Sequence, residues 1–554
     1  MLQQSTDFGA KVKKIYRQAE ERETQRNAKV QGVNYLDSSE APISVEALKD
    51  IPEATAQSLN IGAFQIKGRS LLIAALDPTD PKVKEFAATI THLKPELFMV
   101  SRSSLDHIIS YYKFIPKNLG PITGKIKIEQ DRLEELLNEL TDLEAVNKNI
   151  LSFDINKFSL GQLLEVVLAG ALKNKASDIH MEAEAKSARL RYRLDGLLYD
   201  VSHIENKVYE YLVNRIKLLS ELKINIHDAP QDGRFTTGLK NKDIEFRVSV
   251  IPSEYGETIV MRVLDPDNIN LRLEDLGLKP SDLEIIKEQL KEPNGIIFNT
   301  GPTGSGKTTT LYTFLQYLRS PEMKIITVED PIEYRVEGIE QTQTKPEAEY
   351  DFANALRSIM RQEPDVILVG EVRDKETAEM AIQAALTGHL VLSTIHANSA
   401  AAALPRLLDL GVKTISIAPA LNLVIAQRLV RKLCQTCKGA SKVSSELKEK
   451  VEKFLARMPE RIQKEEYKDY KIYLPHGCND CHNLGYRGRV AVFELLVIND
   501  DYEELITRGA GEVEIFKKAV SDGMTTLQED AILKVLKGIT SLEEVESVTG
   551  PLKW

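Results

Sequence analysis

Hydrophobic and polar positions follow different periods in successive parts of the chain, and each period predicts a different kind of structure. Within residues 35–114, short apolar clusters alternate with helical stretches, which predicts a small α/β domain. Within residues 159–270, apolar and polar residues alternate strictly in segments such as 188–194, and this period of two predicts an antiparallel sheet. Within residues 271–433, short apolar runs alternate with longer helical patterns, which indicates a parallel sheet flanked by helices.

The remaining segments carry weaker patterns. Residues 1–34 are polar and charge-dense with a weak helical period, and they predict a flexible helical lead-in. Residues 115–158 begin with a stretch rich in proline and glycine and continue into a charged helix predicted over 131–146, so we interpret them as a linker. Cysteines bracket residues 434–481 within a predicted tetracysteine module over 434–494, and residues 495–554 predict short helices with a capping signal.

The alternating segment 188–194 also predicts where charge gathers. One face of this strand receives apolar side chains, and the other receives Arg189, Arg191 and Arg193. The next two residues, an Asp-Gly pair, are typical of a tight hairpin turn. The predicted sheet therefore has a cationic face, which is either an ordinary solvated surface or a surface that binds an anion.

A glycine-rich loop joins a short apolar strand, residues 295–300, to a helical pattern. Its sequence GPTGSGKT fills every position of the phosphate-loop pattern, in the strand-loop-helix context that the pattern requires, and this context disfavours a simple turn without a ligand. Glycines let the backbone approach phosphates closely, the lysine adds positive charge, and the hydroxyl after it suits Mg²⁺. We predict ATP contacts from Gly301, Pro302, Thr303, Gly304, Ser305, Gly306, Lys307, Thr308 and Thr309.

Two acidic residues follow apolar runs downstream of this loop. Glu329 ends the run 325–328 and Glu371 ends the run 366–370, at the carboxyl ends of predicted strands, where parallel sheets present their ligands. A single acid after a strand is more often a helix cap or a surface turn, but two of them favour hydrolysis, which needs carboxylates to place metal and water. His396 ends a third strand and is either a structural histidine or a sensor of the γ phosphate.

The four cysteines form two C-x-x-C pairs separated by forty residues. Each pair lets two thiolates from one turn reach a tetrahedral ion, so the spacing predicts a closed structural zinc site. A pair of disulfides is the alternative, which reducing surroundings disfavour. The predicted zinc ligands are Cys434, Cys437, Cys478 and Cys481.

Composition and charge narrow the classes of protein. The chain has 554 residues, 42% hydrophobic and 28% charged, which suggests several globular domains and excludes collagen-like or wholly disordered classes. Its net charge of −10 offers no overall footprint for nucleic acid, so we predict no nucleic-acid partner. No stretch approaches the ~18 apolar residues of a membrane helix, and the start does not resemble a secretory signal, so we expect a cytoplasmic protein.

Together the motifs resemble the secretion and type IV pilus assembly ATPases, the type II/IV secretion superfamily. NTGPTGSGKTTTLY is similar to the Walker A loop of that family, ITVEDPIEY to its Asp box, LRSIMRQEPDVILVGEVRDKETAEMAIQAALTGH to its Walker B stretch and HLVLSTIHANSAAAALPRLLDLGV to its His box. Upstream, SDIHMEAEAKSARLRYRLDG, PQDGRF and EFRVSVIPSEYGETIVMR are similar to its second N-terminal domain. The resemblance implies an α/β fold: a RecA-like P-loop NTPase domain preceded by a PAS-like α+β sheet domain and a small N-terminal α/β domain, with a zinc-binding module and helices at the C-terminus.

The resemblance also implies roles for single residues. ATP and Mg²⁺ would lie between the sheet domain and the RecA-like domain, with Thr308 as a magnesium ligand. Glu329 would be the catalytic base, and Glu371 would organise metal and water. Arginines of the sheet domain would neutralise the phosphates, and the candidates are Arg191, Arg193, Arg215 and Arg234, with Arg247 a weaker one.

By the same resemblance, the chain would be a homo-hexameric motor that hydrolyses ATP to power pilin polymerisation in type IV pilus assembly. It would act on an inner-membrane platform protein, and through it on pilins, while associating only peripherally with the cytoplasmic membrane. The tetracysteine element is similar to that of extension and secretion ATPases, so an ATPase of type II secretion that acts on pseudopilins is the main alternative. A nucleotide-regulated scaffold and a nucleic-acid translocase are the others. Residues 35–114 lack a clear arginine-leucine-glycine signature, so we predict no cyclic-dinucleotide ligand.

Overall fold

The structure is a computed structural model that describes residues 2–38, 41, 43–114, 125–126, 130–153, 160–239, 242–269 and 271–554. The chain forms two compact units, Met1–Asp265 and Pro266–Trp554. Among the described residues, no helix combines the length and the apolar character that crossing a membrane requires. The proline- and glycine-rich start of the predicted linker, 115–124, lies outside the described residues.

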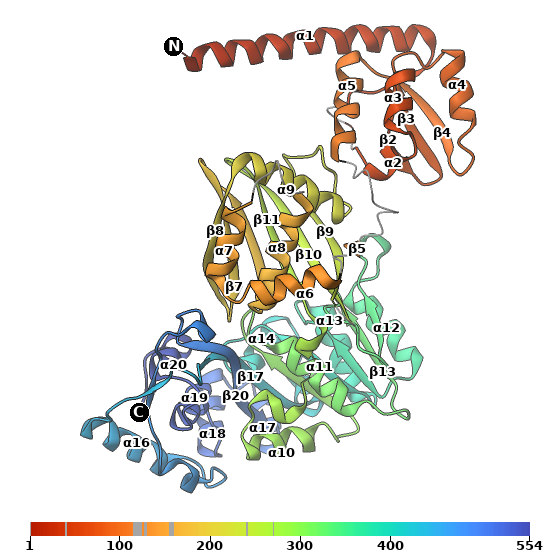
Figure 1. Cartoon of the computed structure of the whole chain (residues 1–554). Coiled ribbons are helices and arrows are strands. Elements are labelled where there is room, and N and C mark those ends of the chain that lie inside the picture. The colour runs from red at the N-terminus through yellow and green to blue at the C-terminus, as the bar shows by residue number, and fades with distance from the viewer. Residues whose placement is uncertain are drawn as a thin grey trace. The chain divides into compact units, whose positions relative to one another are not determined.

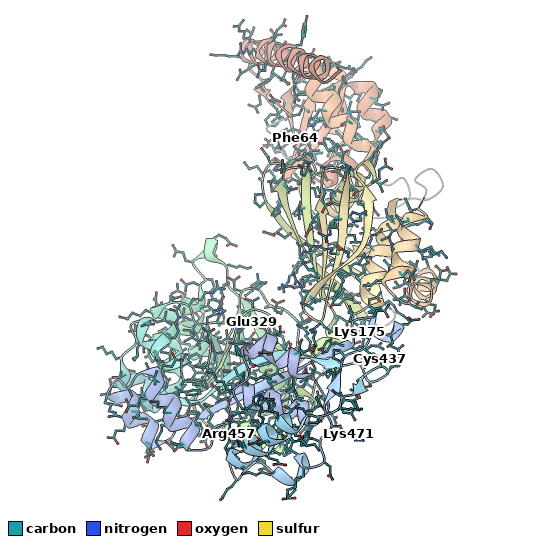
Figure 2. The ribbon with its side chains drawn as sticks, turned by 90° about the vertical axis from the view of Figure 1, so that its left-hand side faces the viewer. Phe64, Lys175, Glu329, Cys437, Arg457 and Lys471 are labelled. Carbon is teal, nitrogen blue, oxygen red and sulfur yellow. The ribbon has the colours of Figure 1, made fainter. Side chains whose placement is uncertain are left out.

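The first unit begins with a long helix followed by a small α/β sheet (Figure 1). The elements are α1 (Leu2–Gln31), β1 (Asn34–Tyr35), α2 (Val45–Lys49), α3 (Glu53–Leu59), β2 (Ile61–Lys67), β3 (Ser70–Ala75), α4 (Pro81–Ala88), β4 (Lys94–Met99) and α5 (Arg102–Ser110). The strand order is β1-β4-β3-β2, with β4 parallel to both neighbours and β2 antiparallel to β3. Phe64 is buried in this sheet and packs edge-on against Phe98 (Figure 2).

A second sheet in the same unit has seven strands in the order β5-β9-β10-β11-β6-β7-β8. The elements are β5 (Lys125–Ile126), α6 (Gln130–Glu139), α7 (Leu143–Leu151), α8 (Leu160–Lys173), β6 (Asp178–Ala183), β7 (Ser187–Leu194), β8 (Leu197–Glu205), α9 (Asn206–Leu219), β9 (Gln231–Leu239), β10 (Lys242–Ser253) and β11 (Gly256–Leu264). The strands from β6 to β11 pair antiparallel, as the alternating pattern predicts. Helices α8 and α9 pack on the apolar face, where the Tyr192 hydroxyl donates to Val167 O at 2.7 Å.

Two local predictions in this unit have opposite outcomes. The hairpin is confirmed, because Asp195 and Gly196 have φ of 48° and 92° and join β7 to β8. The single charged helix predicted over 131–146 is wrong, because two helices, α6 and α7, form there. The Asp142 side chain accepts a hydrogen bond from Ala145 N at 2.8 Å, so it caps a new helix instead of continuing the first.

The second unit is built on a seven-stranded sheet in the order β14-β13-β15-β16-β12-β17-β20. Its elements are α10 (Pro280–Gln289), β12 (Gly295–Thr300), α11 (Lys307–Leu318), β13 (Ile325–Glu329), β14 (Glu340–Gln343), α12 (Phe352–Ile359), β15 (Val366–Val369), α13 (Lys375–Leu386), β16 (Leu390–Ile395), α14 (Ala403–Asp409), α15 (Thr414–Ile417), β17 (Leu421–Leu433) and β20 (Tyr486–Val497). The pairs from β14 to β17 are parallel, and β20 is antiparallel to β17. The predicted α/β class, with its parallel sheet flanked by helices, is confirmed.

The insertion between β17 and β20 packs on the C-terminal helices. These elements are β18 (Gly439–Ala440), α16 (Ser445–Arg457), β19 (Tyr473–Leu474), α17 (Asp500–Thr507), α18 (Glu512–Ser521), α19 (Leu527–Leu536) and α20 (Leu542–Thr549). Phe454 of α16 belongs to one hydrophobic cluster with Ala531 and Val535 of α19. Helix α19 opens with the predicted capping signal, because Thr526 and Glu529 each bond through the side chain to the backbone N–H of the other.

Candidate nucleotide and metal sites

The phosphate loop leaves the end of β12, which lies between β16 and β17, and enters α11. Gly306 caps this helix with φ of 88°, a left-handed conformation that glycine adopts without strain. A Cβ atom on Gly301 would lie 2.5 Å from Gln427 O, so any residue other than glycine would clash at this position. The loop therefore directs the unpaired N–H groups at the start of α11 toward any anion bound in front of the helix.

Lys307 is the first residue of α11, and its side chain folds back over the loop. Its Nζ donates hydrogen bonds to two carbonyl oxygens of the loop, at 2.7 and 3.1 Å. Burial lowers the pKa of Lys307, the nearby Arg428 lowers it further, and Glu371 opposes both effects. The neighbouring Thr308 is exposed, as a ligand of magnesium has to be.

Two of the predicted residues, Glu371 and His396, lie next to each other. Glu371 follows β15 and His396 follows the adjacent β16, and Nε2 of His396 lies 3.6 Å from Oε2 of Glu371. Nε of Arg373 lies 2.6 Å from the same oxygen. The negative charge of Glu371 also raises the pKa of Lys307, so this carboxylate lies near the phosphate loop.

Glu329, at the end of β13, lies deeper in the protein and is only 4% exposed (Figure 2). Its Oε2 accepts a hydrogen bond from the Tyr312 hydroxyl of α11. Its Oε1 accepts from the Thr327 hydroxyl at 2.6 Å and from Nε2 of Gln341 at 3.2 Å. Burial raises the pKa of Glu329 above its ordinary value, and the three donors oppose that rise. The two predicted acids therefore have different environments.

The arginine-bearing face belongs to the first unit. Strand register places one row side by side across five strands: Arg234, Arg247, Arg262, Asp178 and Arg193. Nε of Arg193 and Nε of Arg262 each lie 3.2 Å from an oxygen of Asp178. Arg234 and Arg247 are directly opposite each other, and Nε of Arg247 lies 3.8 Å from an oxygen of Glu245 in the same strand. The row therefore gathers four arginines and one acid on one face of the sheet.

The other predicted arginines lie outside this row. Arg191 is on the same face of β7, two residues before Arg193, and pairs with Glu182. Arg215 comes from α9, on the opposite side of the sheet, where burial lowers its pKa. Arg262 was not among the arginines predicted to neutralise phosphate. The alternation of buried and exposed residues in β11 could have indicated that it lies on this face.

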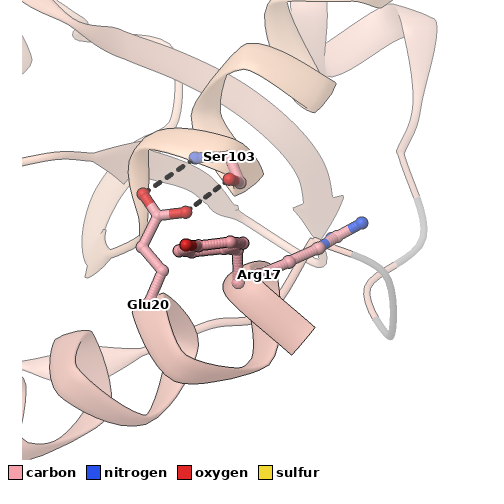
Figure 3. Close-up of a pocket in the computed structure, with 4 residues that line it drawn as sticks. Arg17, Glu20 and Ser103 are labelled. Atoms are coloured by element: carbon pink, nitrogen blue, oxygen red, sulfur yellow. Dashed lines mark hydrogen bonds between the residues drawn. The ribbon is translucent and has the colours of Figure 1, made fainter. Parts of the chain in front are cut away.

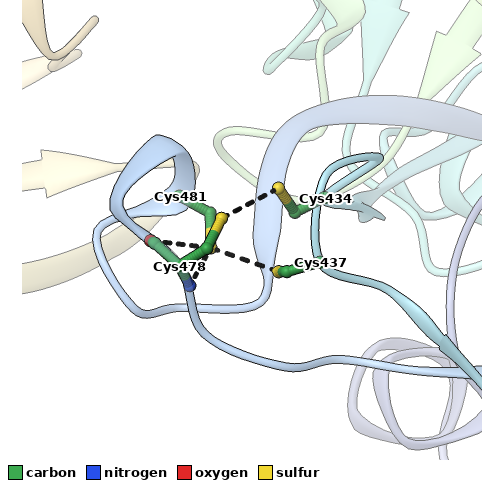
Figure 4. Close-up of side chains that lie close together, drawn as sticks. All are labelled: Cys434, Cys437, Cys478 and Cys481. Carbon is green, nitrogen blue, oxygen red and sulfur yellow. Dashed lines mark hydrogen bonds between the residues drawn. The ribbon is translucent and has the colours of Figure 1, made fainter.

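The four cysteines meet where β17 ends and β20 begins (Figure 4). The Sγ atoms are 3.8 Å apart for Cys434 and Cys478, 3.7 Å for Cys437 and Cys481, and 3.6 Å for Cys478 and Cys481. Four sulfurs at ~2.3 Å from a tetrahedral zinc ion would lie about 3.8 Å apart, so the cluster has the dimensions of a zinc site. The separations far exceed the ~2.05 Å of a disulfide, so the alternative pairing is absent from this cluster.

A separate hollow lies between α1 and α5 in the first unit (Figure 3). Tyr16, Arg17, Glu20 and Ser103 line it. The Glu20 carboxylate accepts hydrogen bonds from the hydroxyl and the backbone N–H of Ser103, near the N-terminus of α5. These bonds tie α1 to α5, and the hollow shares no residue with the phosphate loop.

The strand order, the loop at the end of β12 and the acids after β13 and β15 define the second unit as a P-loop ATPase. Residues 156–547 match the family described as type II/IV secretion system protein, and residues 31–113 match the MshEN domain. The chain belongs to the type II/IV secretion system protein family, which confirms the resemblance seen in its motifs.

Relatives of two kinds are similar over different lengths. The type IV pilus assembly ATPase PilB of Myxococcus xanthus is 35% identical over 526 residues, which cover 95% of this chain and 90% of that protein. The type II secretion system protein E of Aeromonas hydrophila is 42% identical over 388 residues, which cover 70% of this chain and 75% of that protein. Among solved structures, the Legionella pneumophila ATPase DotB covers 72% of this chain and 97% of its own at a TM-score of 0.53 and 22% identity, which supports the fold alone.

Proposed function

We propose that the chain is the motor of a type IV pilus assembly machine, a homo-hexamer that hydrolyses ATP to drive pilin polymerisation. The observation that carries this proposal is the length of the similarity. The relative named for pilus assembly matches 95% of the chain, whereas the relative named for type II secretion matches 70%. A type II secretion motor is the second candidate, because the relative of that kind is more identical over the shorter stretch that it matches, 42% over 388 residues against 35% over 526.

ATP binding rests on the phosphate loop. Backbone N–H groups of the loop and the Lys307 ammonium bind the phosphates, and the exposed Thr308 hydroxyl holds magnesium. Mg²⁺, when bound, neutralises charge on the transferred phosphoryl group. Glu371 and Glu329 are the acids of hydrolysis, and His396, next to Glu371, senses the terminal phosphate.

The arginine row of the first unit, Arg234, Arg247, Arg262 and Arg193, neutralises phosphate charge in the assembled ring. Arginine is suited to this task because its charge is permanent and its planar fork matches phosphate oxygens. Each cycle of nucleotide binding and release then moves domains as rigid bodies, which is how the motor does work. The partners are further copies of the chain and an inner-membrane platform protein, through which the motor acts on pilins from the cytoplasmic side.

The proposed function is tested in the organism that carries the protein. Deleting the gene should abolish surface pili and leave type II secretion intact, and the wild-type gene should restore pili. A matched control gene carries Lys307→Ala, which should be expressed at the same level without restoring pili. Loss of secreted enzymes with normal pili would select the secretion motor. A purified wild-type hexamer that binds ATP but releases no phosphate in the presence of its membrane partner would select the scaffold.

Zinc at the four cysteines is the second proposed ligand, as a structural crosslink that closes the insertion between β17 and β20. We expect purified protein to contain about one zinc per chain and the double variant Cys478→Ser/Cys481→Ser to contain none, by elemental analysis. Trp554, the only tryptophan, packs edge-on to Phe454 of the insertion, so its fluorescence reports on this region. Loss of zinc should lower the unfolding temperature of this region, as followed by Trp554 fluorescence. ATP binding should weaken only at a later stage of zinc removal.

The control for the zinc prediction is His476→Ala, which removes a flanking imidazole and keeps all four sulfurs. It should retain the ion. Equal zinc content in the double cysteine variant and the wild type would contradict the assignment.

A further inference from the structure

The loop that begins with His396, residues 396–402, connects β16 to α14 and is called the His loop below. Asn398 O in this loop accepts a hydrogen bond from Nη2 of Arg428 at 3.0 Å. Arg428 comes from β17, and β12 lies between β17 and β16. The side chain therefore reaches across the end of β12, where the phosphate loop begins.

The same guanidinium lies against the phosphate loop. Its Nη1 donates to Gln427 O at 2.9 Å, and a Cβ atom placed on Gly301 would lie 3.0 Å from Nη1. The Gln427 side chain in turn accepts a hydrogen bond from Nδ2 of Asn299, in β12, at 2.8 Å. Arg428 thus lies beside the first glycine of the phosphate loop and bonds to a carbonyl of the His loop with one rigid, planar group.

The His loop has two further anchors. Thr300 Oγ1 donates to Ala397 O at 2.8 Å and accepts from Ala397 N at 2.7 Å, directly after His396. Glu494 of β20, only 3% exposed, accepts from Ala400 N at 2.8 Å. Side chains from three strands, Thr300 of β12, Arg428 of β17 and Glu494 of β20, therefore fix the position of this loop relative to the phosphate loop.

Charge adds to the geometry. Burial lowers the pKa of Arg428, and Glu494 opposes that change. Arg428 and Lys307 are cations close enough to repel each other, and a polyphosphate placed at the loop relieves that repulsion. The guanidinium is therefore placed to respond to whether the phosphate loop is filled.

We propose that Arg428 is a positioning residue for ATP hydrolysis, which holds the start of the phosphate loop and the His loop in one arrangement. His396 and its neighbour Glu371 then stay beside the terminal phosphate of bound ATP. The proposal deepens the proposed function and rests on hydrolysis at that site. A residue that merely braced the fold would affect stability and leave the chemical step unchanged.

The test compares Arg428→Ala and Arg428→Lys with the wild-type chain in steady-state hydrolysis and in ADP binding, by displacement of a fluorescent ADP analogue. Misplaced catalytic groups cost about 10²-fold in rate, so we expect kcat for Arg428→Ala to fall by roughly 10- to 100-fold at little-changed ADP affinity. Arg428→Lys should recover part of kcat, because its ammonium keeps the charge but cannot make both contacts. If Arg428→Ala does not fold, the lysine variant decides by the same comparison.

Arg431→Ala is the matched control from the same strand, because Arg431 pairs with Glu544 of α20. It should lower the unfolding temperature without lowering kcat. Arg428→Ala with the same stability loss and a wild-type kcat would overturn the proposal. Parallel losses of ADP affinity and kcat would make Arg428 a nucleotide-binding residue instead. Absence of hydrolysis by the wild-type chain, run alongside, would overturn the proposed function and this inference together.

Discussion

Replacing Glu371 by glutamine should lower kcat for ATP hydrolysis by roughly 10²- to 10⁴-fold while ATP binding persists. Under the proposed function Glu371 orients water at the terminal phosphate; it lies 3.6 Å from His396, and its negative charge raises the pKa of Lys307. The amide of glutamine keeps the shape of the side chain but removes the negative charge that organises metal and water. The measurement is phosphate release at saturating MgATP, with nucleotide binding measured in parallel.

The companion variant is Glu329→Gln, because the family resemblance assigns the catalytic base to Glu329. That carboxylate is 4% exposed and already accepts hydrogen bonds from Tyr312, Thr327 and Gln341. We therefore expect a smaller loss of kcat than at Glu371, with a loss of stability, because an amide cannot accept from all these donors. A loss of kcat at Glu329 as large as that at Glu371 would support the base at Glu329.

The control for both acids is Glu379→Gln. Glu379 lies on α13, is half exposed and forms an (i, i+4) pair with Lys375. It should leave kcat unchanged. A comparable loss there would mean that any charge change in this segment disturbs hydrolysis, and the argument for Glu371 would fail.

The parallel sheet and its phosphate loop could be predicted because local physics dictates both. Buried parallel strands are apolar on both faces, so runs such as 295–300 and 366–369 are visible in the sequence. The loop has a fixed spacing of glycines because its backbone takes positive φ angles, 152°, 79° and 88°, at Gly301, Gly304 and Gly306. Such features need no knowledge of what is distant in the chain.

The environments of the two acids could not be predicted in the same way. Glu329 and Glu371 both follow apolar strands, and only the tertiary contacts of Glu329 with Tyr312 on α11 and Gln341 on β14 distinguish them. Arg262 joins the arginine row through register with two neighbouring strands, which the order of residues alone does not fix. In the sequence, Arg428 does not differ from other cations in a strand. Only the strand order, which places β12 next to β17, indicates that it lies near the phosphate loop.

The largest effect on stability is expected at Asp530, a 1% exposed carboxylate in α19. It lies 2.8 Å from Nζ of Lys279 and 2.6 Å from Nζ of Lys534, and it accepts a hydrogen bond from Phe493 N, in β20, at 2.9 Å. Lys279 also pairs with the buried Asp282 at 2.6 Å. Asp530 therefore holds the C-terminal helices to the edge of the ATPase sheet through buried charges.

Asp530→Asn should lower the free energy of unfolding by ~3–5 kcal/mol, because it leaves buried ammonium groups short of a countercharge. Burial alone would raise the pKa of Asp530, but Lys279 and Lys534 lower it to about 2. A carboxylate with a depressed pKa stabilises the fold above the unfolded pKa of about 3.9, and that contribution is lost as the pH falls toward 2. The wild type should therefore lose stability through this acid range, and the asparagine variant should lack this component of the loss.

Urea unfolding followed by Trp554 fluorescence measures this effect, because Trp554 packs against the same cluster as α19. The matched control is Asp501→Asn, an exposed partner of Lys518, for which a surface pair predicts at most about 1 kcal/mol. If Asp530→Asn unfolds at the urea concentration of the control, the charges around Asp530 are hydrated in solution rather than buried. A large shift confined to Asp530 would instead mean that the C-terminal helices are held to the ATPase sheet by a countercharge that water cannot replace.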